Sequence, residues 1–235
     1  MKYKRIMLKL SGEVLLGGLA SGIERERLEG LCREILDVQK EGIEVAVVIG
    51  GGNFWRYRNQ KELELDRVTL DNMGIMATVM NAVAMQSMFE KLGAAARVAS
   101  AIDVPQIAEP YRRRKVMRHL EKGRVVICAG GTGSPFFTTD SAASLRALEL
   151  NCDVLLKATK VDGVYDKDPE KHTDAKKFET LTYHDVLEME LEFMDQAAVS
   201  LCKEGNLPIV VFNLAKEGNI QRAALGEKIG TRVTS

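Results

Sequence analysis

The chain has 235 residues, of which 46% are hydrophobic, so it can bury a large core and matches the size of a single α/β domain. Basic and acidic side chains number 33 each. The formal net charge is therefore zero, which excludes a general attraction to nucleic acid or anionic membranes and means that any anion-binding site must be local.

The first ten residues, MKYKRIMLKL, alternate charged and apolar side chains and lack the apolar block of a signal peptide. Apolar runs such as 45–49 and 125–129 are far shorter than the ~20 residues that a membrane span needs. We therefore expect a cytoplasmic protein without a membrane partner.

Short runs rich in β-branched or apolar residues recur along the chain and predict strands at 5–10, 44–49, 96–102, 124–129, 153–157 and 208–213. Helical periodicity fills the spaces between them, as in Glu24–Lys40 and Asp140–Leu150. Alternating helices and near-continuous apolar strands predict an α/β fold in which helices cover both faces of a mostly parallel sheet.

Residues 162–182 interrupt this alternation with a stretch rich in Asp, Lys and Gly that contains Pro169. Because the α/β pattern resumes afterwards, we interpret the segment as an exposed excursion, such as a hairpin, and not as a linker between domains. Residues 1–235 are thus expected to form one domain.

Cysteine and histidine spacing suggests no metal site or disulfide framework, since neither CxxC nor HxxxH occurs. The cysteines are expected to be buried thiols: Cys32, Cys128, Cys152 and Cys202.

Glycine-rich turns follow three predicted strands: KLSG at 9–12, GGGN at 50–53 and GGTG at 130–133. Such turns let backbone N–H groups converge on an anion, and ligands of open α/β sheets bind at the carboxyl ends of strands. The GxxxxGK[ST] and GxGxxG patterns are absent, which argues against a P-loop enzyme and a dinucleotide oxidoreductase.

Three cations accompany these turns. Lys9 and Lys157 interrupt apolar strands, where a lysine is costly unless it is paired, and Arg56 follows the GGGN turn. A solvated strand end for Lys9 and a basic surface cluster for Arg56 are the alternatives. Together, the three could neutralise a polyphosphate.

Five segments, taken in order and spacing, resemble the bacterial uridylate (UMP) kinases of the amino acid kinase superfamily: KLSG, VVIGGGN, LDNMGIMATVMNA, GGTGSPFFTTDSAA and LLKATKVDGVYDKDP. The similarity runs from Tyr3 to the C-terminus. PFFTTD with KATKVDGVY is specific to this group, whereas KLSG and GGG also occur in carbamate, acetylglutamate and aspartate kinases.

The resemblance implies transfer of the γ-phosphoryl group of Mg-ATP to UMP, giving UDP and ADP in pyrimidine nucleotide biosynthesis. It also implies a three-layer αβα sandwich, the amino acid kinase fold, assembled as a hexamer that responds to GTP or UTP. Mg²⁺ would arrive with ATP and be held mainly by phosphate and water, so we name no protein ligand for it.

The resemblance also implies the site residues. For catalysis they are Lys9, Arg56, Asp140 and Lys157. For ATP they are Lys9, Leu10, Ser11, Gly12, Gly52, Arg56, Thr159, Tyr165 and Asp168. For UMP they are Gly51, Asp71, Thr132, Gly133, Ser134, Pro135, Phe136, Phe137, Thr138 and Thr139. The effector segment corresponds to Gly17, Gly18 and Gly22 within GGLASG.

Several of these residues keep a structural alternative. Phe136 and Phe137 either exclude water beside the nucleotide or belong to the core. The threonines of 132–139 either bind the nucleotide, which the resemblance favours, or cap the following helix. Asp71 either binds ribose or is an ordinary residue near a helix start, and Asp140 could serve as an N-cap, hold the lysines by charge, or do both.

The chain departs from the family pattern after the GGGN turn, where Trp55–Arg58 replaces Phe-Arg-Gly, and in GGLASG, which lacks acidic and aromatic residues. YRRRK at 111–115 could bind an effector or RNA, but zero net charge favours a solvated helix face. The rivals are a kinase for carboxylates or carbamate, which would lack PFFTTD, and a nucleotide-binding protein without turnover, which would lose Lys9, Arg56 or Asp140.

Overall fold

The computed structural model describes residues 2–55 and 63–235. Its sheet has nine strands in the order β4-β3-β5-β2-β1-β6-β8-β9-β7, and every pairing is parallel except that of β8 with β9. The strands are β1 Arg5–Leu10, β2 Glu44–Ile49, β3 Ala96–Ser100, β4 Glu109–Pro110, β5 Val125–Ala129, β6 Val154–Thr159, β7 Thr180–Thr182, β8 Ile209–Asn213 and β9 Thr231–Thr234.

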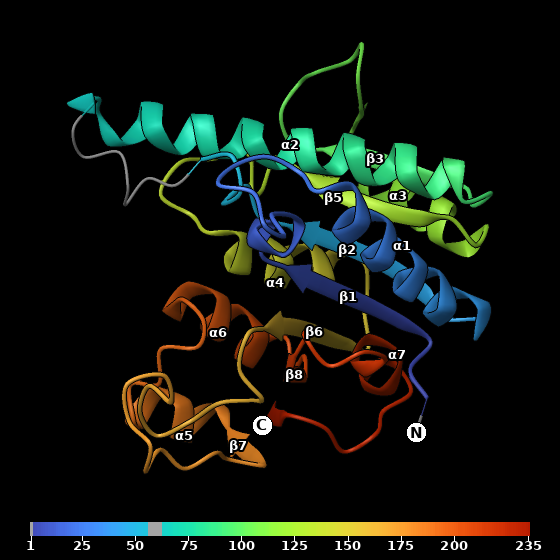
Figure 1. The fold of residues 1–235 in the computed structure, drawn as a ribbon. Helices are drawn as coiled ribbons and strands as arrows, with labels where there is room; N and C mark the ends of the chain where they lie inside the picture. The colour runs from blue at the N-terminus through green and yellow to red at the C-terminus, as the bar shows by residue number, and fades with distance from the viewer. Residues whose placement is uncertain (1, 56–62) are drawn as a thin grey trace.

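Helices cover both faces of this sheet, as the strand pattern predicts (Figure 1). One face packs against α1 Arg25–Lys40, α2 Arg67–Lys91 and α7 Asn219–Ala224. The other face packs against α3 Arg113–Glu121, α4 Thr139–Glu149, α5 Tyr183–Glu188 and α6 Gln196–Glu204. A short 3₁₀ helix, η1 Gly12–Leu15, follows β1. The prediction of an αβα sandwich is confirmed.

All six predicted strands exist, with boundaries within two residues of the prediction. The short strands β4, β7 and β9 were not predicted. They extend the sheet at its two ends, and the antiparallel pairing of β9 with β8 makes the sheet mixed.

The central strands place two lysines side by side. Lys9 of β1 is in register with Lys157 of β6, and the sheet faces alternate along each strand. Ile6, Leu8 and Leu10 belong to the core on the α1 and α2 side, whereas Met7 belongs to the core under α4. Lys9 therefore shares the face of Met7 and lies beneath α4.

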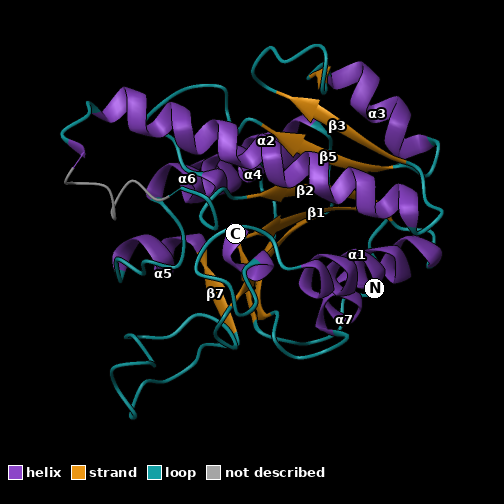
Figure 2. Cartoon of the chain, turned by 45° about the horizontal axis from the view of Figure 1, so that its top comes forward, coloured by secondary structure: helices purple, strands orange, loops and turns teal. Residues whose placement is uncertain are grey.

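The segment after β6 folds back on itself as an exposed loop with hairpin pairing. Tyr165 and Lys177 form an antiparallel bridge, and the Phe178 N–H donates to the Val164 carbonyl at 2.9 Å. In Figure 2 this region is drawn almost entirely as loop before the short strand β7.

Helix α2 is apolar on more than its core-facing side. Among the described residues it alone is long and apolar enough to cross a membrane by length and composition, with 44% of the tested window buried. The core helix of a soluble protein passes the same test, so this property alone indicates no membrane span.

The four cysteine thiols are buried, as predicted, and all four are unpaired. Burial raises the pKa of Cys32 and Cys128 to about 12. These thiols are therefore packing residues.

Candidate functional site

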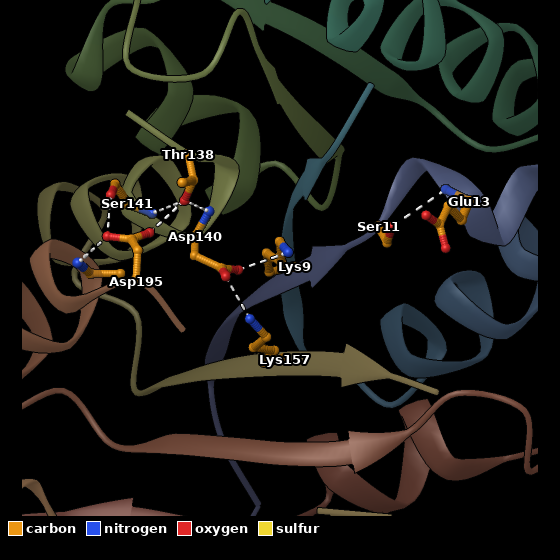
Figure 3. A network of polar contacts seen from close by, with 9 residues as sticks. Lys9, Ser11, Glu13, Thr138, Asp140, Ser141, Lys157 and Asp195 are labelled. Carbon is orange, nitrogen blue, oxygen red and sulfur yellow. Dashed lines mark hydrogen bonds and ion pairs between the residues drawn. The ribbon is translucent and has the colours of Figure 1, made fainter. Parts of the chain in front are cut away.

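Asp140, in the first turn of α4, lies between two lysine ammonium groups. Its Oδ1 forms an ion pair with Lys9 Nζ at 2.7 Å, and its Oδ2 accepts a hydrogen bond from Lys157 Nζ at 2.5 Å. Figure 3 shows the three side chains pointing toward one another at the carboxyl edge of β1 and β6. The side chains of Lys9, Asp140 and Lys157 are only 11%, 14% and 9% exposed, so the cluster is largely withdrawn from water.

This arrangement keeps one positive charge in excess in a poorly hydrated place. Burial would raise the pKa of the Asp140 carboxyl, but the charges of Lys9 and Lys157 hold that pKa below its usual range. Burial lowers the pKa of Lys157 to about 8 despite the attraction of Asp140. An incoming phosphate would be attracted to the excess charge, and would itself raise the pKa of Lys157.

The start of α4 is fixed by hydroxyl groups. Thr138 is the N-cap and accepts hydrogen bonds from the N–H groups of Asp140 and Ser141 at 3.0 and 3.4 Å. The suggestion that Asp140 itself is the N-cap is therefore wrong. A cap accepts from N–H groups two or three positions ahead, and Thr138 precedes α4 with extended backbone, whereas Asp140 lies inside the helix.

Asp195 is a residue of this network that the sequence analysis missed. Its carboxylate accepts hydrogen bonds from the hydroxyls of Thr138 and of Ser141, the latter at 2.8 Å, and from the N–H of Ala198 at 2.9 Å (Figure 3). Asp195 is thus the N-cap of α6 and joins that helix to α4. An Asp before QAAVSL is a recognisable N-cap, but its contact with Thr138 spans 57 residues and has no local signal.

A cleft of about 720 Å³ opens beside the lysines, between the end of β6 and the loops 163–170 and 189–193. Of the residues expected at the ATP site, those that line it are Lys9, Ser11, Thr159, Tyr165 and Asp168, and Lys157 lines it as well. Leu10 does not line it, and its side chain is fully buried in the core. Arg56 lies outside the described residues.

Gly12 and Gly52 do not line this cleft; they lie where the KLSG and GGGN turns pack together. A Cβ on Gly12 would come within 2.5 Å of the Gly50 carbonyl oxygen and 2.8 Å of the Gly52 nitrogen. Only glycine allows this approach, so the glycine in KLSG has a packing reason independent of any ligand.

A second, smaller cavity of about 160 Å³ is lined by the start of α4, the loop before it and α2. The expected UMP-site residues that line it are Gly51, Asp71, Thr132, Ser134, Phe137, Thr138 and Thr139. Gly133, Pro135 and Phe136 do not line it. Trp55, Leu70 and Thr78, which were not predicted, contribute to its wall.

Asp71 is already engaged at the rim of this cavity. Both of its carboxylate oxygens lie 2.8 Å from Nε of Arg67, one helical turn earlier, and Oδ2 also accepts from the N–H of Phe136 at 2.8 Å. Asp71 therefore ties the 130–138 loop to α2.

Phe136 and Phe137 are 65% and 55% exposed, so the alternative that both are core residues is wrong. Phe136 has φ +69°, a left-handed conformation that is unfavourable for a side chain with Cβ. The Arg67 guanidinium lies 5.5 Å from its ring centroid. The loop thus carries local strain and two exposed rings, of which only Phe137 lines the cavity.

The glycines of the expected effector segment line neither cleft nor small cavity. Gly17 and Gly22 have positive φ, and the Gly22 N–H donates to the Asn53 carbonyl at 3.1 Å. The segment therefore contacts the GGGN turn without lining either cavity. Arg112–Lys115 are exposed at the start of α3, as the solvated-face interpretation predicts.

The described residues contain no group of three His, Cys, Asp or Glu side chains that could hold a metal ion. Asp140, whose side chain is 14% exposed, is neutralised by two lysines that line the cleft. This donor set suits a metal that arrives bound to phosphate better than a resident ion.

Comparison with known proteins gives one family and several full-length structural relatives. The amino acid kinase family model matches residues 4–213. A UMP kinase from Bacillus anthracis is 39% identical with a TM-score of 0.96, covering 100% of this chain and 97% of that one. A UMP kinase from Ureaplasma parvum is 36% identical with a TM-score of 0.94, covering 100% of both chains. A uridylate kinase from Archaeoglobus fulgidus is 29% identical with a TM-score of 0.75, again over 100% of both chains.

Proposed function

This chain belongs to the amino acid kinase family, and from that premise we propose that it transfers the γ-phosphoryl group of Mg-ATP to UMP, giving UDP and ADP. The observation that carries the proposal is the pair of cavities, the larger lined by Lys9 and Lys157 and the smaller by the start of α4, whose Asp140 contacts both lysines. The full-length relatives at 36–39% identity, which are UMP kinases, support the choice of acceptor.

We assign ATP to the larger cleft. Lys9 and Ser11, which line it, would face the phosphates, and Thr159, Tyr165 and Asp168 the adenosine part. Gly12 and Gly52 do not line it and are assigned to the phosphates from the sequence resemblance alone. Asp168 is oriented by an ion pair with Lys171 at 3.0 Å. Arg56, outside the described residues, is assigned to the phosphates from the sequence resemblance alone.

We assign UMP to the smaller cavity. Asp71 would accept hydrogen bonds from the ribose hydroxyls, while Gly51 and the loop 132–139 would surround the rest of the nucleotide. The small volume and the contact of Asp71 with Phe136 imply that the loop moves outward when UMP enters. The exposed, strained Phe136 is consistent with such a movement.

The reaction needs no general base, because the second pKa of a phosphate monoester is near ~6 and the attacking oxygen of UMP is already ionised at neutral pH. That oxygen forms a bond to the γ-phosphorus while the bond to the β–γ bridging oxygen breaks, and ADP leaves with the electron pair. Lys9 and Lys157 would neutralise the charge spread over the transferring group. Asp140 would hold both ammonium groups in place. Mg²⁺ enters as part of the Mg-ATP substrate.

We also propose a homo-oligomer, a hexamer by the sequence resemblance, in which α2 contributes to a contact between copies. Met73, Met76 and Met80 lie on one side of α2 and are 38%, 59% and 52% exposed. An apolar stripe of this kind on a helix is typical of a subunit interface. A cytoplasmic location, a place in pyrimidine nucleotide synthesis, and GTP or UTP as effectors remain proposals of the same kind.

The proposal is tested by measuring ADP release from Mg-ATP with UMP, CMP, dTMP, AMP, N-acetylglutamate and carbamate as separate acceptors. We expect fast turnover with UMP. Fast turnover with a carboxylate or carbamate instead would move the chain to another branch of the family. Binding of ATP without turnover of any acceptor would favour a nucleotide-binding protein.

A further inference from the structure

A pair of buried asparagines holds the GGGN turn and lines neither of the two cavities. Asn53 ends the GGGN turn, and Asn81 lies in the middle of α2; they are 3% and 0% exposed. The Asn53 Nδ2 donates to Asn81 Oδ1 at 2.9 Å, and the Asn81 Nδ2 donates to Asn53 Oδ1 at 2.7 Å. The two amides thus form a reciprocal pair, each serving as donor and acceptor.

Each amide uses its second N–H to hold a different stretch of backbone. Asn81 Nδ2 donates to the Gly50 carbonyl at 2.7 Å, which fixes the start of the GGGN turn against α2. Asn53 Nδ2 donates to the Gly22 carbonyl at 2.9 Å. The backbone carbonyl of Asn53 accepts in return from the Gly22 N–H and from the Ser21 hydroxyl, at 3.1 and 3.0 Å.

The pair therefore joins three segments that are far apart in sequence: the loop at 21–22, the turn at 50–53 and helix α2. A fourth segment packs directly against it, since a Cβ on Gly12 would lie 2.5 Å from Asn53 Oδ1. On the other side of the turn, a Cβ on Gly51 would lie 2.6 Å from the Ala77 Cβ of α2. The turn is held between β1 and α2 with little room to shift.

We infer that Asn53 and Asn81 are positioning residues of the phosphate-transfer site, and that their reciprocal pair sets the position of the GGGN turn relative to the KLSG turn. A buried amide that loses its partner leaves polar atoms without hydrogen bonds. Any other position of the turn would break the pair and is therefore less stable. Because bound groups displaced by about 1 Å can lose ~10²-fold in rate, fixing this turn matters for transfer. The inference rests on the proposed function, which assigns ATP phosphates to Gly12 and Gly52 and UMP to Gly51.

The same pair gives the loop at 21–22 a direct mechanical connection to the turn. Three hydrogen bonds, all made by Asn53, link that loop to the turn. Any ligand or subunit contact that displaces the loop must break or carry along these bonds. A displacement of the loop at 21–22 would therefore shift the GGGN turn and, with it, the phosphate-transfer site.

The test uses the full-length protein and the variants Asn81→Asp, Asn53→Asp, Asn81→Ala and Asn53→Ala. Aspartate preserves shape and the acceptor oxygen but removes both donated hydrogen bonds, so it carries the test if an alanine variant fails to fold. Ser144→Ala is the matched control, because Ser144 of α4 is also fully buried and polar but its hydroxyl contacts Cys202 of α6 and not the GGGN turn. Each variant is assayed for kcat and KM with Mg-ATP and UMP, for Mg-ATP binding by calorimetry, and for Tm.

We expect each asparagine variant to lose about 10- to 100-fold in kcat/KM and to bind Mg-ATP more weakly, while Ser144→Ala keeps both values within about twofold. Because the pair acts as a unit, the double alanine variant should be no more than about threefold worse than the worse single variant. Asparagine variants whose Tm falls but whose kcat/KM and Mg-ATP affinity stay within twofold of wild type would overturn the inference. If wild type binds Mg-ATP but does not phosphorylate UMP, the proposed function fails while the binding measurement still decides the role of the pair.

Discussion

At the scale of single residues, the site depends on two lysines that share one buried carboxylate. Sequence alone indicates that lysines inside apolar strands need partners, and Asp140 supplies that partner to both. What the sequence does not indicate is that Lys9 and Lys157 are in register on adjacent strands, because β1 and β6 are separated by most of the chain. Their excess charge is the feature on which phosphate transfer would depend.

Replacing Lys9 by methionine keeps the side chain's bulk but removes its charge. We expect kcat with UMP to fall by about 10²- to 10³-fold, which is the usual loss when one donor to a transition-state charge is removed. The fold should persist because Asp140 keeps its hydrogen bond to Lys157. Lys40→Met, at an exposed position of α1, is the control for the substitution itself. A Lys9→Met variant with wild-type kcat would remove Lys9 from the mechanism.

The pH dependence of kcat/KM and of stability should follow the protonation of Lys157. Its pKa in the folded protein, about 8, lies below its unfolded value, so its charge is complete below pH 8 and is lost as the pH rises through 8. We therefore expect kcat/KM, which reflects the free enzyme, to fall above about pH 8. Stability should change in the opposite direction, because the unfolded chain binds the extra proton between pH 8 and 10.5 and the folded state gains relative stability there.

Measuring kcat/KM and Tm over a pH series tests both predictions, the fall in kcat/KM and the rise in stability above about pH 8. A kcat/KM that stays flat to pH 10 would show that the charge of Lys157 is not needed for transfer. The acid side of the profile should follow ionisation of the UMP phosphate near pH ~6.

Asp71→Asn should weaken UMP more than ATP. The asparagine amide has only one acceptor oxygen. It also lacks the negative charge of the Asp71 carboxylate, which pairs with Arg67 and would accept hydrogen bonds from the ribose hydroxyls. We expect KM for UMP to rise about tenfold, equivalent to about 1.4 kcal/mol, with KM for Mg-ATP within about twofold. Equal effects on the two KM values, measured by varying each substrate at saturation of the other, would move Asp71 out of the acceptor site.

At the scale of helices and strands, the sequence pattern predicted a strand where both faces of that strand are buried in the sheet, because its residues are then almost all apolar. The six central strands were predictable because each is a near-continuous apolar run. The strands β4, β7 and β9 were not, because they have two to four residues and depend on pairing with β3, β8 and each other. Asp195 was missed for a similar reason: its N-cap role is local, but its contacts with Thr138 and Ser141 are tertiary.

The Asn53–Asn81 pair shows the same limit in the candidate site. The sequence marks GGGN as a turn that brings backbone groups toward an anion. It does not show that Asn81, 28 residues later and within α2, supplies the amide that fixes the turn. The motif residues were thus accessible from sequence, whereas the residues that hold the motifs together were not.

Helix α2 should form a contact between copies. Introducing charge with Met76→Glu and Met80→Glu places carboxylates where we expect buried methionine side chains, each worth about 1.5–3 kcal/mol when fully buried. The double variant should dissociate to smaller species in sedimentation velocity at a protein concentration where wild type is oligomeric. Leu187→Glu, at a partly exposed position of α5, is the control. An unchanged sedimentation coefficient for the α2 variant would place the interface elsewhere.

At the scale of the whole molecule, three glycine turns from β1, β2 and β5 meet at one edge of a sheet, and α2 and α4 hold them from opposite faces. Asn81 of α2 holds the Gly50 carbonyl, and Thr78 of α2 accepts from the Gly130 N–H at 2.9 Å. The α4 side supplies Asp140 and the two lysines. This arrangement gives a large cleft lined by Lys9 and Lys157 and a smaller cavity lined by the start of α4, the two places to which we assign the nucleotides.

The most direct measurement is transfer of label from [γ-³²P]ATP in a single turnover, with enzyme in excess over ATP, Mg²⁺ and UMP present, and the products separated by chromatography. We expect the label to appear in UDP at a rate matching ADP formation, and Lys9→Met to slow this transfer by at least about 100-fold. Label released as inorganic phosphate, or retained in ATP that remains bound to a folded enzyme, would contradict phosphoryl transfer to UMP.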